Sequence, residues 1–137
     1  MRVVLDPNIV ISGVLSSQGA PANVLRALAA GEFELIVSSA LLDELERALG
    51  YPKLRRQIDD AAPAALVRWL ADSATHAADP ATEPPVHSRD PDDDYLVALA
   101  AAHRAALVSG DKHLLALDDE IPVFSPRAFV DLLAKNP

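Results

Sequence analysis

The chain of 137 residues contains no cysteine, which excludes disulfides, thiolate metal sites and cysteine nucleophiles. Aromatic residues make up only 4% of it, so platforms for stacking single-stranded bases are poorly supplied. The chain has 12 lysine and arginine residues against 20 acidic residues. The resulting formal charge of −8 argues against binding of nucleic acid through overall positive charge. No apolar run approaches membrane-spanning length, and the N-terminus does not have the pattern of a signal sequence. We therefore expect a cytoplasmic protein with no membrane partner.

The sequence also lacks the common short motifs of metal and phosphate chemistry. Its four histidines are not spaced as metal ligands. Neither a glycine-rich phosphate loop nor a Gly-x-Ser-x-Gly turn is present. Carboxylates remain as the candidates for a chemical site, and their hard oxygen atoms favour Mg²⁺ or Mn²⁺ over Zn²⁺.

Half of the residues are apolar, which over this length predicts one domain, residues 1–137, with a hydrophobic core. Apolar and β-branched stretches predict strands at 2–6, 33–38, 106–111 and 121–126. A helix is expected to begin at Asp6-Pro7, and further helices are predicted at 22–30, 40–50, 53–58, 62–74, 90–104, 112–117 and 127–135. The Pro-rich segment 76–90 is predicted to be irregular, with a short extended piece near Val86. This alternation predicts an α/β fold, in which helices cover both faces of a parallel sheet of about four to five strands.

Four acidic residues are predicted to meet at one edge of this sheet. Ligands of such folds bind outside the carboxyl ends of the strands. Asp6 ends the first strand, and Asp111 lies two residues beyond Ser109, where a later strand ends. Glu44 lies on the helix after the second strand, and Asp94 lies in the first turns of the helix that leads into strand 106–111. The sequence therefore predicts a cluster of carboxylates at this edge.

Each acid also has a purely structural interpretation. Asp6 and Asp111 stand where helix N-caps are expected. Acids in a first helical turn interact favourably with the helix dipole, which accounts for Asp90, Asp92 and Asp93. Asp94 lies one step further along, on the same helix face as apolar residues. It therefore requires a partner or a cation, which makes it the stronger functional candidate of the acidic run.

The acids of helix 40–50 are not separated by periodicity. Glu44 and Glu46 flank the apolar stripe of Leu41, Leu45 and Leu49 on opposite sides. A solvated helix edge is the simpler interpretation of either residue.

Basic residues gather at Lys53, Arg55 and Arg56, within one predicted helix. Such a cluster is usually a solvated helix face, although it could also contact a nucleic-acid backbone. Lys112, which follows Asp111, is a further candidate for such a contact.

Taken together, several motifs resemble those of PIN-domain nucleases. They are Asp6-x-Asn8 after an apolar strand, Glu44-Leu45 after VSSALLD, and the stretches RDPDDDYLVALA and LVSGDKHLLAL. The stretch VVLDPNIVISGVLSSQGAP is similar to toxins of the PIN family from toxin–antitoxin systems, relatives of the VapC toxins. The resemblance extends from residue 2 to about residue 130, and the order of the motifs makes it specific.

This resemblance implies a three-layer α/β/α PIN-like fold in which acids bind Mg²⁺ or Mn²⁺ and RNA is cut. By position, Asp6, Glu44 and Asp94 match the core acids of the family, and Asp111 matches the fourth. The match favours Glu44 over Glu46. Asn8 matches a supporting residue, and Ser109 is a second candidate for that role.

One position departs from the family pattern. Many PIN domains carry Thr or Ser between the first Asp and the Asn, whereas this chain has Pro7, which offers neither a hydroxyl nor an N–H. Ser109 or Ser12 could supply the missing hydroxyl.

We therefore expect a metal-dependent endoribonuclease, the toxin of a toxin–antitoxin system, in which a metal-activated water attacks phosphorus. Its expected partners are the RNA substrate, a cognate antitoxin and a second copy of itself in a homodimer. One alternative is an inactive PIN-fold module that binds RNA or protein. Another is a phosphatase with an aspartyl intermediate, although such enzymes require a second Asp where this chain has Asn8.

Overall fold

The structure, a computed structural model, describes residues 1–135 and is built on five parallel strands. The strands lie in the order β3-β2-β1-β4-β5 and all neighbouring pairs are parallel. Their bounds are β1 Arg2–Leu5, β2 Glu34–Val37, β3 Ala74–His76, β4 Ala106–Val108 and β5 Val123–Phe124. The predicted α/β class and parallel sheet are thus confirmed.

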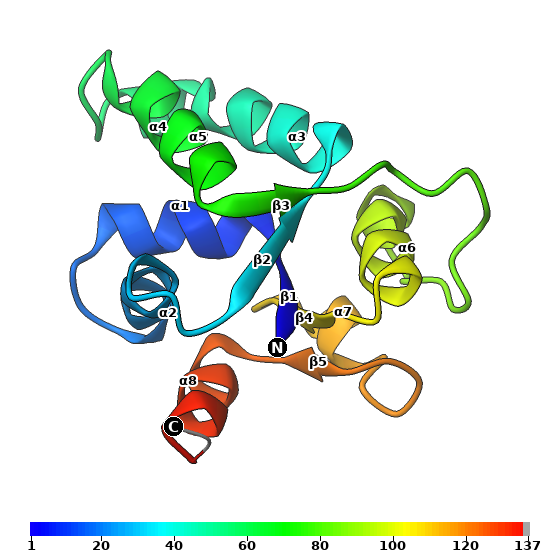
Figure 1. Cartoon of the computed structure of the whole chain (residues 1–137). Helices are drawn as coiled ribbons and strands as arrows, with labels where there is room; N and C mark the ends of the chain where they lie inside the picture. The colour runs from blue at the N-terminus through cyan, green and yellow to red at the C-terminus, as the bar shows by residue number, and fades with distance from the viewer. Residues whose placement is uncertain (136–137) are drawn as a thin grey trace.

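Helices cover both faces of the sheet (Figure 1). In this view α1, α2 and α8 lie on the left of the sheet, α6 and α7 lie on the right, and α3 to α5 lie above β3. The helices are α1 Pro7–Leu15, α2 Ala20–Ala29, α3 Ser39–Leu49, α4 Pro52–Arg55, α5 Ala62–Asp72, α6 Asp94–Ala102, α7 Lys112–Leu115 and α8 Pro126–Lys135. A 3₁₀ turn, η1 Pro91–Asp93, precedes α6.

The central strands form the core because their residues are apolar on both faces. Val3, Val4 and Leu5 of β1 are at most 1% exposed. The interior stretches of β2 and β4 are buried in the same way. Such continuous apolar runs are typical of parallel strands covered by helices on both sides. Within residues 1–135, no helix combines the length and the hydropathy that a bilayer crossing requires.

The predicted start of α1 is confirmed, because Asp6 is its N-cap and Pro7 its first residue. The segment after α5 differs from the prediction. Ala74–His76 forms the edge strand β3 beside β2, with Leu35 opposite Ala74. These three residues have no apolar alternation, so only their pairing with β2 defines them as a strand. The segment near Val86 is not a strand.

The start of the predicted helix 90–104 also differs, in a way that matters for the site. Asp90 is the cap, as expected, but it caps the 3₁₀ turn, and the α-helix begins only at Asp94. A 3₁₀ turn advances by about 120° per residue because it has three residues per turn, against about 100° in an α-helix. The faces on which the acids of this turn lie are therefore not those of a continuous α-helix.

Close packing of α1 on α2 generates a testable prediction at Gly13. A Cβ atom at this position would lie 2.6 Å from Leu25 Cδ1 and 2.9 Å from the backbone oxygen of Pro21. Gly to Ala in an open helix position stabilises by about 1 kcal/mol, whereas overpacking costs about 1–3 kcal/mol. We expect Gly13→Ala to lower the melting temperature. Gly110→Ala, where the added Cβ meets nothing within 4 Å, is the matched control. A Gly13→Ala variant as stable as this control would contradict the packing argument.

Candidate active site

The site begins where β1 and β4 end side by side. Leu5 pairs with Val108 in the sheet, so the next residues of the two strands, Asp6 and Ser109, become neighbours. The Ser109 hydroxyl donates to Asp6 Oδ2 at 2.8 Å, and the Asn8 backbone N–H donates to Asp6 Oδ1 at 2.9 Å. Both Asp6 oxygens are therefore held, in a residue that is only 4% exposed.

Burial raises the pKa of Asp6 above its ordinary value, and the negative charges of Asp111 and Glu44 raise it further. The hydrogen bonds from Asn8 and Ser109 act in the opposite direction, because they stabilise the carboxylate. Because the net effect is to raise the pKa of Asp6, its surroundings disfavour the negatively charged carboxylate.

Ser109 connects two of the predicted acids. Its hydroxyl oxygen accepts from the Asp111 backbone N–H at 3.0 Å while the hydroxyl proton is given to Asp6. Asp111 in turn caps α7, since its Oδ1 accepts from the His113 backbone N–H at 2.7 Å. The capping interpretation of Asp6 and Asp111 is thus correct, and it coexists with their convergence on one corner.

Asp93, the last residue of η1, is the third carboxylate at this corner. Burial, the neighbouring Asp111 carboxylate and the charges of Asp6 and Asp90 together raise the pKa of Asp93 to about 7. Its Oδ2 atom is buried and is the one such side-chain oxygen or nitrogen within residues 1–135 that has no hydrogen-bond partner. A buried carboxylate oxygen with no donor is costly unless a proton or a cation meets it.

Glu44 approaches the same corner from α3. The Ser38 hydroxyl caps this helix by accepting from the Leu41 N–H at 3.3 Å. Asp79, from the segment after β3, accepts from the Ala40 N–H at 3.0 Å and ties the helix start to the edge of the sheet. These contacts fix the helix that carries Glu44.

A cavity of about 220 Å³ lies between these elements. Glu44 borders it and forms an ion pair with Arg47, one turn further along α3. Burial raises the pKa of Tyr95, another lining residue, and the negative charge of Glu44 adds to this effect. The carboxylates that line the cavity are Asp6, Glu44, Asp90, Asp92 and Asp93.

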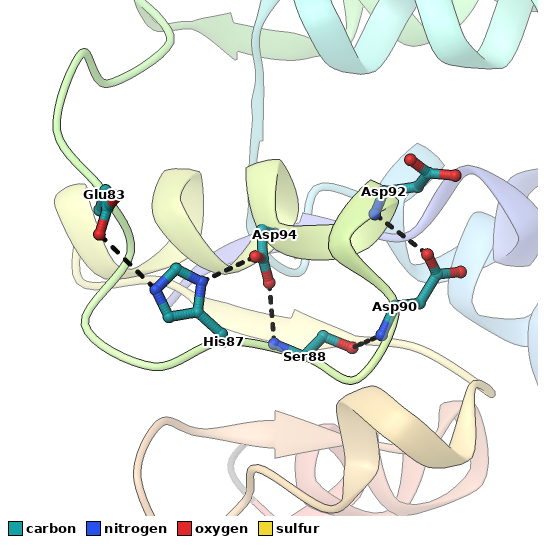
Figure 2. A network of polar contacts seen from close by, with 6 residues as sticks. All are labelled: Glu83, His87, Ser88, Asp90, Asp92 and Asp94. Atoms are coloured by element: carbon teal, nitrogen blue, oxygen red, sulfur yellow. Dashed lines mark hydrogen bonds and ion pairs between the residues drawn. The ribbon is translucent and has the colours of Figure 1, made fainter.

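The structure does not place Asp94 at the cavity. Its Oδ1 accepts from the Ser88 backbone N–H and its Oδ2 contacts His87 Nδ1, both at 2.8 Å (Figure 2). Asp94 is therefore occupied by the Pro-rich segment, and Asp93 lines the cavity in its place. The partner that an acid on this face requires is thus provided by the protein itself. The 3₁₀ turn over Pro91–Asp93 is the reason, because it turns Asp93 towards the carboxyl ends of the strands.

Comparison with known proteins assigns the fold. The sequence model of the PIN domain matches residues 2–113. The chain belongs to the PIN-domain family. This membership supports a nuclease, since PIN domains are a family of nucleases.

Individual relatives are distant. An uncharacterized protein of Methanocaldococcus jannaschii, MJ1680, is 26% identical over 98% of this chain and 93% of its own length. The solved structure of VapBC2 from Rickettsia felis, bound to a promoter DNA fragment, contains a chain with a TM-score of 0.62 and 15% identity. FitAcB from Neisseria gonorrhoeae gives a TM-score of 0.58 and 19% identity. Each of the two structural alignments covers 91% of this chain and 98% of the other chain. At such low identities, these two alignments establish the shared fold alone.

The cavity of this PIN domain has the donor chemistry of a hard divalent cation site. Its donors are carboxylate oxygens, and Asp93 offers a buried oxygen that lacks a partner. The repulsion that raises the pKa of Asp6 and Asp93 is of the kind that a cation would relieve. Within the part of the chain that the structure describes, no three such side chains stand close enough to ligate one ion together. Side chains would therefore have to turn towards a bound cation.

The four basic residues named from the sequence do not line this cavity. Lys53 and Arg55 belong to α4 and Arg56 follows it, and all three are exposed. Arg55 also lies 3.7 Å from Asp60. Lys112 is exposed at the start of α7, beside the acidic corner.

The hydroxyl that Pro7 cannot supply is present in another residue. Ser109 is fully buried and donates to Asp6. Ser12, the other candidate, is exposed on α1. Asn8 supports Asp6 through its backbone N–H.

The raised pKa of Asp93 predicts how the metal-free protein responds to pH. In the folded state this group keeps its proton up to about pH 7, against an ordinary value of 3.8. Its contribution to stability is therefore complete below the unfolded pKa and is lost as the pH rises through the folded pKa. Asp93→Asn removes this titration. In EDTA, the melting temperature of the variant should exceed that of the wild type by an amount that grows up to about pH 7 and then levels off.

Asp119→Asn, which alters an exposed carboxylate outside the cavity, is the control for this measurement. If Asp93→Asn and the wild type lost stability in parallel as the pH rose, the raised pKa of Asp93 would be refuted.

Proposed function

We propose that this PIN-domain protein is a metal-dependent endoribonuclease. The observation that carries the proposal is the buried, partnerless Oδ2 of Asp93, which lies in a carboxylate cavity beside Asp6 and Asp111. A structural role alone would not gather like charges at a buried corner, because each raises the free energy of the others.

Asp6, Glu44, Asp93 and Asp111 are the proposed ligands of Mg²⁺ or Mn²⁺. Bound there, the cation would lower the pKa of a water molecule and neutralise charge on the phosphate. The protein itself holds Asp6 in place through Ser109 and Asn8. Asp6 would thus be the most firmly held of the proposed ligands, whereas Glu44 is held by its ion pair with Arg47.

The substrate is proposed to be RNA, by analogy with the family that the motifs resemble. Hydrolysis of this type does not use the 2′-hydroxyl of the substrate, so the chemistry alone does not separate RNA from DNA. The formal charge of the chain is −8, so overall charge would not attract a nucleic acid. The proposed contacts to phosphate are therefore made by individual basic side chains. The candidate residues are Lys53, Arg55, Arg56 and Lys112.

The toxin role is proposed from the resemblance and from the fold shared with VapBC2 and FitAcB. The implied partners are a cognate antitoxin and a second copy of the chain, and both would be met in the cytoplasm. An antitoxin could place a basic side chain in the acidic cavity.

The other expected functions have less support. An inactive binding module was suggested by Pro7, but the Ser109 hydroxyl reaches Asp6 from the neighbouring strand. A phosphatase with an aspartyl intermediate would need a second Asp two positions after the nucleophile, where this chain has Asn8.

The nuclease is tested with labelled single-stranded RNA in Mn²⁺ or Mg²⁺. We expect cleavage that EDTA stops, and a loss of about 100-fold or more in Glu44→Gln, because one charged group of the site is removed. Glu46→Gln, which changes an acid two positions further along the same helix, should leave the rate unchanged. Cleavage that persists in EDTA, or an equal loss in both variants, would reject the proposed site.

The toxin role needs a separate test in living bacteria. Expression of the wild type should arrest growth, whereas the Asp93→Asn variant should not. Co-expression of the neighbouring reading frame should restore growth if it encodes the antitoxin. Normal growth with the wild type, despite RNA cleavage by the purified protein, would leave a nuclease that is not a toxin.

A further inference from the structure

The contacts of Asp94 form a clamp, by which we mean its hydrogen bonds to His87 and Ser88. Figure 2 shows the Asp94 carboxylate, on the first turn of α6, pointing at the segment that returns beneath it. Oδ1 accepts from the Ser88 N–H and Oδ2 contacts His87 Nδ1, each at 2.8 Å. The Asp94 side chain is 21% exposed, and Ser88 is buried. Both oxygens are thus used to join the two ends of a short loop.

The residues inside the clamped loop are ordered by further hydrogen bonds. The Asp90 N–H donates to the Ser88 hydroxyl oxygen at 3.2 Å, and the Asp92 N–H donates to Asp90 Oδ1 at 3.0 Å (Figure 2). The Asp93 N–H donates to the Asp90 carbonyl at 3.0 Å. The backbone of Asp93 is therefore fixed through Ser88, which the clamp holds.

Asp93 depends on such support because one of its two side-chain oxygens has none. Its Oδ2 is buried and has no hydrogen-bond partner. Constraints on the backbone therefore help to keep Asp93 at the corner, and the hydrogen bonds that begin at Asp94 are such constraints.

We propose that Asp94 is a positioning residue, which clamps segment 87–88 to α6 and so directs Asp93 into the acidic cavity. The inference rests on the proposed function, since it assigns to Asp93 a ligand that the chain must present. It differs from a ligand role for Asp94 itself, because the carboxylate of Asp94 interacts with protein groups.

The two roles are separated by Mn²⁺ calorimetry on three variants of the full chain. Asp93→Asn should weaken Mn²⁺ binding by about tenfold or more, because a ligand charge is lost. Asp94→Ala should also weaken it by about tenfold, within the range known for residues that orient metal ligands. Asp94→Asn should bind nearly as the wild type does, because its amide oxygen can still accept from the Ser88 N–H and its NH₂ can face neutral His87.

Two results would overturn the proposal. If Asp94→Asn lost as much affinity as Asp93→Asn, the charge of Asp94 would be required and it would be a ligand. If Asp94→Ala bound Mn²⁺ like the wild type, the clamp would not position the site. Asp119→Ala, which removes an exposed acid elsewhere, controls for the change in net charge.

Amide hydrogen exchange of the metal-free protein gives an independent measurement. The Ser88 and Asp93 amides should be protected in the wild type and in Asp94→Asn, and should exchange faster in Asp94→Ala. Unchanged protection of both amides in Asp94→Ala would refute the clamp. A wild type that binds no Mn²⁺ would instead refute the proposed function, while the exchange data would still decide whether the clamp orders Asp93.

Discussion

Repulsion between neighbouring carboxylates is the constraint that shapes this end of the molecule. Asp6, Asp93 and Asp111 stand close enough for each to affect the others, at a corner where Asp6 is almost fully buried and the other two are partly buried. Such an arrangement is stable only if other groups hold each acid in place or neutralise it. Most of the hydrogen bonds around the site hold one of these acids in place.

The parallel sheet brings Ser109 into contact with Asp6 and Asp111. Because β1 and β4 are neighbours that end at the same level, Ser109 can give its proton to Asp6 and accept from the backbone of Asp111. The rigid apolar core behind these strands fixes the positions of all three residues. Helix α6 and its 3₁₀ turn hold Asp93, since its backbone N–H donates to the Asp90 carbonyl while its Oδ2 has no partner.

The site therefore combines a rigid acid with acids that are less restrained. Asp6 has both oxygens occupied and almost no exposure. Glu44 is half-buried and holds only Arg47, which is itself on the surface. An exposed ion pair of this kind is worth little, so Glu44 can exchange Arg47 for another cation at small cost. Such a mixture would suit the proposed site, which would form fully only when a cation binds.

The sequence by itself determined the buried strands, the class of fold, and the positions of Asp6 and Asp111 at strand ends, because burial and capping leave local patterns. The tertiary structure decided the rest. Strand β3 exists through its pairing with β2, and periodicity could not choose between Glu44 and Glu46 until α3 was set beside the cavity. The tertiary structure likewise decided that Asp93, rather than Asp94, lines the cavity. Which of two adjacent acids faces the sheet depends on the rotation per residue of one short turn, and that rotation is set by contacts with Ser88 and Asp90, which helical periodicity does not encode.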